Sequence, residues 1–222
     1  KPVDRPDRAQ LIQRKVLSGD YDFKGVVFKY TEDDPRPTLV IPQLKIHAGE
    51  KVAILGRNGA GKSSLLQLLS GMQLPVQGKI SLDGVDQSLL DPDDIRRDMA
   101  LLNQNAHLFF GTIRENLTLG APLASNDEII RALQITNALE IVEQKKEGLD
   151  HLILEGGVGF SGGQKQALLL TRLLLRNPNI VLLDEPTASI DDVSEKVLIQ
   201  HLKEWLGHRT LVVATHRPAV LQ

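Results

Sequence analysis

Eight residues in the first third of the chain, from Gly56 to Ser63, fit the pattern G-x-x-x-x-G-K-[ST] of a P-loop, and Ser64 follows them. Glycines in such a loop let the backbone curl so that its N–H groups point inward and can hold phosphate oxygens. Lys62 can reach the β- and γ-phosphates of a nucleotide, and the hydroxyl of Ser63 can bind Mg²⁺. The pattern therefore predicts a site for a nucleoside triphosphate and Mg²⁺, formed by Gly56, Arg57, Asn58, Gly59, Ala60, Gly61, Lys62, Ser63 and Ser64.

The residues on either side of this loop support that interpretation. Val52 to Leu55 is a short apolar run typical of a buried strand, and Ser63 to Leu69 has the composition of a helix start. A strand before the loop and a helix after it are the context that a P-loop requires, and the helix adds the positive end of its dipole. The alternative is a glycine-rich turn before an ordinary helix, which the Lys-Ser pair after a strand disfavours.

A second group of chemically useful residues follows the apolar run Ile180 to Leu183, where Asp184 and Glu185 stand side by side. Ligands of open α/β sheets bind at the carboxyl ends of the strands. There, Asp184 could hold the Mg²⁺ of a P-loop site, and Glu185 could take a proton from an attacking water molecule. Alone, this pattern also describes a strand that simply leaves the core; together with a P-loop it predicts a hydrolytic site.

A third group precedes a long helix and consists of Ser161, Gly162, Gly163 and Gln164. Ser161 can cap the helix, and the two glycines expose N–H groups, so this helix start could also bind an anion. The alternative is a flexible loop followed by an ordinary cap. One chain rarely surrounds one triphosphate with two phosphate sites, whereas two chains arranged head to tail can do so.

The elements that must position these groups alternate along the second half of the chain. Gln164 to Arg176 and Val193 to Leu206 read as helices, and Ile180 to Leu183 and Leu211 to Ala214 read as strands. Alternating strands and helices favour a parallel sheet with crossover connections.

Two further regions look like additions to that sheet. Tyr21 to Tyr30 and Leu39 to His47 are rich in strand-forming residues, and Phe109 to Leu175 is mainly helical. Before them, Gln10 to Leu17 could form a short helix within a polar segment that resembles a linker.

Composition narrows the class of protein. With 222 residues, 41% of them hydrophobic, one α/β domain of ordinary core size is expected, with a division into two lobes possible. The net charge of −2 shows no excess of basic residues of the kind that binds nucleic acid. The chain has no cysteine for a disulfide or thiolate metal site. No uncharged apolar run approaches the roughly 18 residues of a membrane span, and no signal peptide is visible. Both ends look cut.

Together these motifs, in this order, resemble the nucleotide-binding domain of ABC transporters across nearly the whole chain. In that resemblance, Tyr30 matches the aromatic residue that stacks on adenine, Gln104 the Q-loop residue that touches Mg²⁺, and His216 the histidine that contacts the γ-phosphate. Ala188-Ser189-Ile190-Asp191 matches the D-loop, with Ala188 in place of the usual serine, and Phe160 replaces the usual leucine of the signature Leu-Ser-Gly-Gly-Gln. Without the resemblance, Tyr30 could be a plain strand aromatic, Gln104 a surface residue and His216 a strand-end histidine.

The resemblance implies an α/β fold: a RecA-like P-loop NTPase core with a parallel sheet, an antiparallel β subdomain and an inserted helical subdomain. We expect residues 1–19 to be a linker from a missing membrane domain, and 20–105 to hold the β subdomain and the first part of the core. We expect 106–170 to be the helical subdomain with the signature, and 171–222 the second part of the core. The implied ligands are ATP and Mg²⁺. The implied partners are a second copy and a transmembrane domain of the same polypeptide, at the cytoplasmic face of the plasma membrane, with no nucleic acid.

Within ABC transporters, the run from Leu108 to Leu117 resembles the exporter pattern, and Glu155 resembles the acid that senses the membrane part. Pro2 to Pro6 and Asp91 to Arg97 look most like the bacterial type I secretion branch, the haemolysin and LapB-type adhesin exporters. The expected function is ATP hydrolysis that powers export, with Glu185, His216 and Lys62 as catalytic residues and Ser63, Gln104 and Asp184 around the metal. A lipid or drug exporter is the alternative within the family. A nucleotide-gated binding module that hydrolyses poorly is the alternative of another class, and a DNA-repair ATPase of the SMC kind is disfavoured by the compact middle segment.

Overall fold

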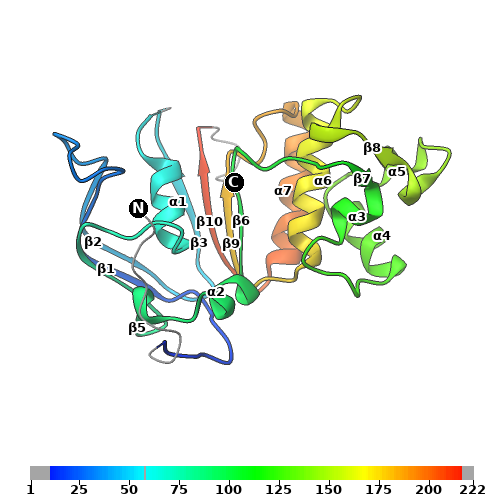
Figure 1. Cartoon of the computed structure of the whole chain (residues 1–222). Coiled ribbons are helices and arrows are strands. Elements are labelled where there is room, and N and C mark those ends of the chain that lie inside the picture. The colour runs from blue at the N-terminus through cyan, green and yellow to red at the C-terminus, as the bar shows by residue number, and fades with distance from the viewer. Residues whose placement is uncertain (1–10, 58, 217–222) are drawn as a thin grey trace. The chain divides into compact units, whose positions relative to one another are not determined.

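The computed structural model describes residues 11–57 and 59–216 (Figure 1). These residues form two compact units. Unit 1 takes in residues 11–101, 178–184 and 208–216, and unit 2 takes in 102–177 and 185–207. Each unit is therefore assembled from segments that are distant in the chain.

One sheet of unit 1 is antiparallel, with the order β2-β1-β4-β5. Its strands alternate buried and exposed side chains because successive residues of a strand face opposite sides. In β1, Phe23 lies opposite Leu44 of β2 and Ile80 of β4. The strands predicted at Tyr21 to Tyr30 and Leu39 to His47 are confirmed as β1 Tyr21–Phe28 and β2 Leu39–Ile46. β4 Gln77–Leu82 and β5 Val85–Asp86 complete the sheet.

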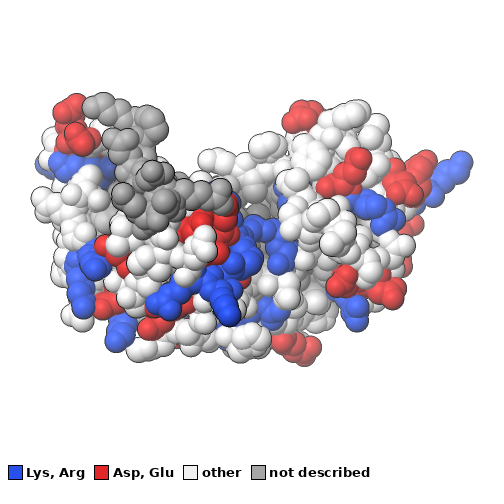
Figure 2. Space-filling model, turned by 60° about the horizontal axis from the view of Figure 1, so that its bottom comes forward, with Lys and Arg blue, Asp and Glu red and all other residues white. Residues whose placement is uncertain are grey.

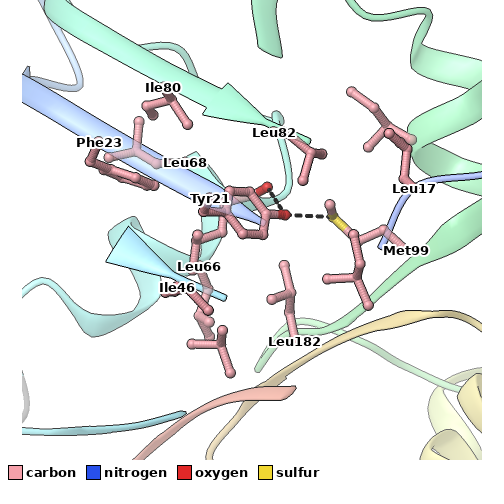
Figure 3. Packing of buried hydrophobic residues seen from close by; sticks show 14 of the residues in the cluster. Leu17, Tyr21, Phe23, Ile46, Leu66, Leu68, Ile80, Leu82, Met99 and Leu182 are labelled. Carbon is pink, nitrogen blue, oxygen red and sulfur yellow. Dashed lines mark hydrogen bonds between the residues drawn. The ribbon is translucent and has the colours of Figure 1, made fainter. Parts of the chain in front are cut away.

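The inward side of this sheet contributes to the hydrophobic core of unit 1 (Figure 3). Tyr21 is fully buried there, and its hydroxyl donates a hydrogen bond of 2.8 Å to the carbonyl oxygen of Leu69. The Met99 sulfur lies 4.0 Å from the same hydroxyl. A polar group at the centre of the core is thus satisfied by the end of a helix, as a buried hydroxyl must be.

The second sheet of unit 1 has the order β3-β10-β9-β6, and β10 pairs in parallel with both β3 and β9. Helix α1, Lys62–Leu69, is the next element after β3 along the chain (Figure 1). The predicted parallel core with an antiparallel β subdomain is confirmed. The strands are β3 Lys51–Leu55, β6 Met99–Leu102, β9 Ile180–Asp184 and β10 Thr210–Thr215, and the short helices are η2 Gln87–Leu89 and α2 Pro92–Asp98.

Unit 2 is mainly helical, with α6 packed against α3 and α4. Three of its helices begin with a capping box, at Thr112, Ser125 and Ser161, in which side chain and backbone satisfy each other's hydrogen bonds. The capping box predicted at Ser125 is confirmed. The elements are β7 Gly111–Thr112, α3 Ile113–Leu117, α4 Asn126–Ile135, α5 Leu139–Glu143, η3 Gly148–Asp150, β8 Leu152–Ile153, η4 Glu155–Gly157, α6 Gly162–Leu175 and α7 Asp192–Leu206.

The short helix considered for Gln10 to Leu17 is wrong for the described residues, 11–17, which are not helical. Two of their backbone N–H groups donate to distant acids instead: that of Arg14 to Asp94 Oδ2 and that of Leu17 to Asp98 Oδ2, each at 2.7 Å. The N–H groups of Ser18, Gly19 and Asp20 all donate to the carboxylate of Asp83, at 2.6, 3.1 and 2.8 Å. Acidic acceptors from elsewhere in unit 1 thus replace the local bonds that a helix would make.

Basic and acidic side chains are interspersed over the described residues on the face that Figure 2 shows. Ion pairs among the described residues include Arg97 with Asp94 at 2.7 Å and Lys24 with Asp22 at 3.1 Å. Within the described residues, no helix combines the length and apolar composition needed to cross a bilayer.

Candidate nucleotide-binding site

The P-loop connects β3 to α1 in unit 1, as predicted. Gly59 and Gly61 have φ of 82° and 86°, a left-handed backbone that favours glycine. A β-carbon on Gly61 would also lie 2.5 Å from Leu39 Cδ2, so a side chain is excluded there by space as well as by conformation. Asn58, predicted to bind the nucleotide, lies outside the described residues.

Lys62 is buried, with 8% of its surface exposed. Its ammonium group donates to the carbonyl oxygen of Gly56 at 2.5 Å and to that of Arg57 at 3.1 Å. The cation is therefore held inside the curve of the loop, where phosphate oxygens were predicted to bind.

The two predicted metal ligands of unit 1 lie in direct contact. Ser63, in the first turn of α1, donates a hydrogen bond of 2.6 Å from its hydroxyl to Asp184 Oδ2. Asp184 is the last residue of β9 and is 5% exposed. A hydroxyl and a carboxylate oxygen at this distance can both face one Mg²⁺, which prefers oxygen ligands.

Tyr30, two residues after β1, lies next to the P-loop helix. Its hydroxyl shares a hydrogen bond of 2.8 Å with the hydroxyl of Ser64, and its ring packs edge-on against Phe28 with centroids 4.9 Å apart. The side chain is 54% exposed. An aromatic ring fixed at two points beside the loop, with much of its surface open, suits the predicted stacking on a base.

The strand register places His216 at the same edge as the loop. Thr215 of β10 lies opposite Leu55 of β3, and Ala214 lies opposite Asp184 of β9. His216 is therefore level with Gly56, where the P-loop begins, and it follows β10, the strand that lies between β3 and β9. Unit 1 thus brings together most of the residues predicted to surround the phosphates.

Glu185 is the first residue after β9 and belongs to unit 2. It is 7% exposed and has φ of 49°, a left-handed conformation that is uncommon for glutamate. Such a backbone typically costs about 1–3 kcal/mol and is concentrated at functional sites. No pattern in the sequence predicts this left-handed conformation.

Gln104 also belongs to unit 2 and follows the end of β6 by two residues, with its surface exposed. It lies in a turn, between β6 and the segment that leads to β7. The structure places it in a loop after a core strand.

The predicted signature forms the start of α6. Ser161 caps the helix: its hydroxyl accepts from the N–H of Gln164 at 3.1 Å, and Gln164 Oε1 accepts from the N–H of Ser161 at 2.9 Å. Ser161 and Gly162 are exposed. Both polar side chains of the signature are thus fixed by the helix start, while the backbone at Gly162 stays accessible.

Phe160, which replaces the usual leucine of the signature, is only 9% exposed. The Lys145 ammonium lies 4.9 Å from its ring centroid, a cation–π contact. The ring of His151 meets it edge-on with centroids 6.2 Å apart. An aromatic ring therefore has specific neighbours at this position.

The predicted D-loop packs on the signature within the same unit. A β-carbon on Gly163 would lie 3.0 Å from the carbonyl oxygen of Ser189 and 3.1 Å from Ile190 Cγ2, so a larger residue would crowd this contact. Asp191 caps α7, accepting from the N–H groups of Val193 and Ser194 at 3.0 Å each. These bonds, led by those from Ser194, hold the pKa of Asp191 below its ordinary value.

One contact was not predicted from the sequence. The side chain of Gln166, in the first turns of α6, donates from Nε2 to the carbonyl oxygen of Glu185 at 2.8 Å and accepts at Oε1 from the N–H of Ser189 at 3.2 Å. The only available signal was a second glutamine two positions after Gln164. It could not show which backbone groups that amide would reach.

The family profile described as ABC transporter matches residues 41–188. The chain belongs to the ABC transporter family. It is an ATPase domain of this family, and it has the α/β fold described above.

Curated ABC proteins similar to this domain include the alpha-hemolysin translocation ATP-binding protein HlyB of Escherichia coli O157:H7, 34% identical over 97% of this chain. The leukotoxin translocation ATP-binding protein LktB of Mannheimia glucosida is 35% identical over 90% of the chain. The chain spans 30% of the length of HlyB and 28% of that of LktB. Among solved structures, a bacterial Atm1-family ABC exporter with ATP bound matches with a TM-score of 0.90 at 30% identity, over 99% of this chain and 38% of the other.

Proposed function

We propose that this ABC ATPase domain hydrolyses ATP to power an exporter of the type I protein secretion kind. The observation that carries the hydrolytic role is the contact between Ser63 and Asp184, at 2.6 Å, beside the loop that encloses Lys62. The secretion role is supported by the similarity to HlyB and LktB, whose names describe translocation of a hemolysin and a leukotoxin.

Mg²⁺ would be held by Ser63, Asp184 and Gln104, and would neutralise charge on the phosphates. The residues fit this ion. Among the described residues no group of three or more His, Cys, Asp or Glu side chains could hold a metal on its own. That suits Mg²⁺, which usually binds through one or two carboxylates together with substrate phosphates.

The remaining roles follow from the chemistry of each side chain. Lys62 binds the terminal phosphates, and Tyr30 stacks on the base. Glu185 accepts a proton from the attacking water molecule as the new phosphorus–oxygen bond forms and the bond to the leaving ADP breaks. His216, level with the start of the P-loop, donates a hydrogen bond to the γ-phosphate.

A second copy of the domain would complete each site. The start of α6 offers exposed backbone N–H groups and a helix dipole to phosphate. Ser161 to Gln164 of one chain would therefore contact the ATP held by the P-loop of another, with Asp191 near the shared interface. This arrangement requires two copies in head-to-tail orientation.

A membrane domain would contact unit 2 around Glu155. The carboxylate of Glu155 accepts from the N–H of Phe110 at 3.2 Å. Four apolar side chains near this pair in the sequence are 48–65% exposed, namely Phe110, Leu152, Leu154 and Val158. Exposed apolar side chains that stand near an acid in the sequence suit a protein partner better than water. This contact would place the domain at the cytoplasmic face of the membrane.

The test is ATPase activity per molecule across a dilution series, with assembly followed by sedimentation. We expect specific activity to rise with protein concentration, because each site needs a second chain. Ser161→Arg should suppress hydrolysis and leave ATP binding unchanged, whereas Lys62→Ala should weaken binding itself. In an equimolar mixture of the two variants, each mixed dimer should retain at most one working site. A flat activity profile from a proven monomer would overturn the shared site.

A further inference from the structure

The left-handed backbone of Glu185 needs a support, because a strained conformation persists only where its surroundings hold it. The carbonyl oxygen of Glu185 accepts two hydrogen bonds. One comes from the backbone N–H of Ala188 at 3.3 Å and closes a turn; the other comes from Gln166 Nε2 at 2.8 Å. The shorter bond comes from a side chain on another element.

The same amide also holds the far end of that turn. Gln166 Oε1 accepts from the N–H of Ser189 at 3.2 Å. Both hydrogen-bonding ends of one side chain are thus used to bridge Glu185 and Ser189, which lie four positions apart. An amide is the natural group for this task, since it offers a donor and an acceptor on one short plane.

The support is itself rigid. Gln166 is half-buried on α6, and the residues that follow it in the helix, Leu168, Leu169 and Leu170, are buried in unit 2. The turn is also close to the signature, because Ser189 lies against Gly163 of the same helix. Glu185, the D-loop and the signature helix are therefore joined through Gln166 within one unit.

We propose that Gln166 is a positioning residue for ATP hydrolysis, which holds Glu185 in the orientation that its role as a base requires. This inference rests on the proposed function, in which Glu185 takes the proton from water. In the proposed function, Gln166 contacts neither the substrate nor the metal. It acts on the rate only through the backbone of Glu185.

Two substitutions of Gln166 test its hydrogen bonds to the Glu185 carbonyl and to the N–H of Ser189. Gln166→Glu keeps the acceptor for the N–H of Ser189 but loses the donor to the Glu185 carbonyl, and it brings a carboxylate against that oxygen. Gln166→Met has a similar length and loses both bonds without adding charge, so it tests the proposal even if the charged variant folds poorly. Gln200→Glu, on the exposed side of α7, is the matched control.

We expect Gln166→Glu and Gln166→Met to lower kcat about tenfold, the scale of one hydrogen bond, with KM and binding of a fluorescent ATP analogue unchanged. The decisive measurement repeats both substitutions in a Glu185→Gln background. There they should not slow the residual rate further, because the residue that they position no longer acts as a base. The Gln200→Glu control should match the parent in both backgrounds.

Two results would overturn the proposal. One is a kcat of Gln166→Glu and Gln166→Met equal to that of the parent, while Glu185→Gln alone is inactive; the proposed function would then stand and the positioning role would fall. The other is the same fractional loss with and without Glu185, which indicates a general structural role. Near-normal turnover of Glu185→Gln alone would instead refute the base itself, and the positioning role with it.

Discussion

The hydroxyl of Ser63 lies 2.6 Å from Asp184 Oδ2, although 121 positions separate the two residues in the chain. The contact joins the first turn of α1 to the end of β9 and brings two oxygen atoms to the place where the P-loop begins its helix. It is the geometric basis for the proposed Mg²⁺ site.

Ser63→Ala and Asp184→Asn should each raise the Mg²⁺ concentration for half-maximal ATPase activity. We expect a shift of at least about 10- to 100-fold, because even outer ligands of metal sites have effects of this size. The measurement is a Mg²⁺ titration of ATPase activity at saturating ATP. Ser70→Ala is a matched control, since the Ser70 hydroxyl lies at the other end of α1, where it donates to the carbonyl oxygen of Gln67 at 3.0 Å and accepts from the N–H of Met72 at 3.4 Å. An unchanged Mg²⁺ dependence in both site variants would refute their role as ligands.

Glu185→Gln should slow hydrolysis by about 10²–10⁴-fold, the usual scale for loss of a general base. ATP binding should persist, because the amide keeps the size of the side chain, and the ATP-bound dimer should accumulate. Single-turnover kinetics with sedimentation in ATP would measure both effects. Glu204→Gln, on the exposed surface of α7, supplies the comparison. If the Glu185 variant turns over normally, another group such as His216 takes the proton.

Tyr30→Ala should weaken binding of ATP and GTP alike, by about 1–3 kcal/mol, because stacking requires a ring face and no particular hydrogen-bond pattern. Tyr30→Phe keeps the ring and loses the hydroxyl with its hydrogen bonds to Ser64 at 2.8 Å and Gln67 at 3.4 Å, so its nucleotide affinity should stay close to that of the parent. Equilibrium titrations with both nucleotides would measure this. A strong preference for one base that survives Tyr30→Ala would contradict the stacking role.

Tyr21 should make the stability of the protein sensitive to alkaline pH. Complete burial, with a smaller contribution from Asp83, raises the pKa of Tyr21 well above its ordinary value of 10.0. The folded state therefore favours the protonated phenol. Its contribution to stability is fully present below pH 10, where the phenol is protonated in both states. The contribution is lost progressively as the pH rises from the unfolded pKa through the folded one.

Tyr21→Phe should remove this part of the alkaline sensitivity. At pH 8 the variant should lose about 1 kcal/mol of stability, the net value of the hydrogen bond to the Leu69 carbonyl. Between pH 8 and pH 10.5, its urea midpoint should fall less than that of the parent. Tyr30→Phe is the control, because Tyr30 is half exposed. Parallel falls in the Tyr21 variant and the parent would show that another group controls the alkaline transition.

Features that depend on neighbours in the chain could be predicted from the sequence. The glycines of the P-loop, the capping box at Ser125 and the cap at Ser161 involve bonds across about three or four positions, so residue type and spacing nearly decide them. The apolar run that becomes β9 was predicted for the same reason, since a strand buried on both faces contains no polar residue. The resemblance to ABC transporters rests on such local motifs, and its assignment to the family is confirmed.

The order of the motifs along the sequence also identified the candidate site residues, but it could not show where these residues lie in the fold. Lys62, Ser63 and Asp184 are brought together by the parallel order β3-β10-β9, which is a property of the whole sheet. The domain boundaries at 19, 105 and 170, and the binding roles of Gln104, Asp191 and the signature, stay predictions.

What the sequence by itself determined, then, is which short segments can bind phosphate, metal and base, because that ability depends on local residue types. Only the tertiary structure decided how distant groups meet. Residues 11–17 are not helical because acids such as Asp98 accept their N–H groups. Glu185 is left-handed in a turn that Gln166 holds from α6. Both outcomes depend on hydrogen bonds between residues far apart in the chain, and such bonds leave no spacing or period by which a sequence could reveal them.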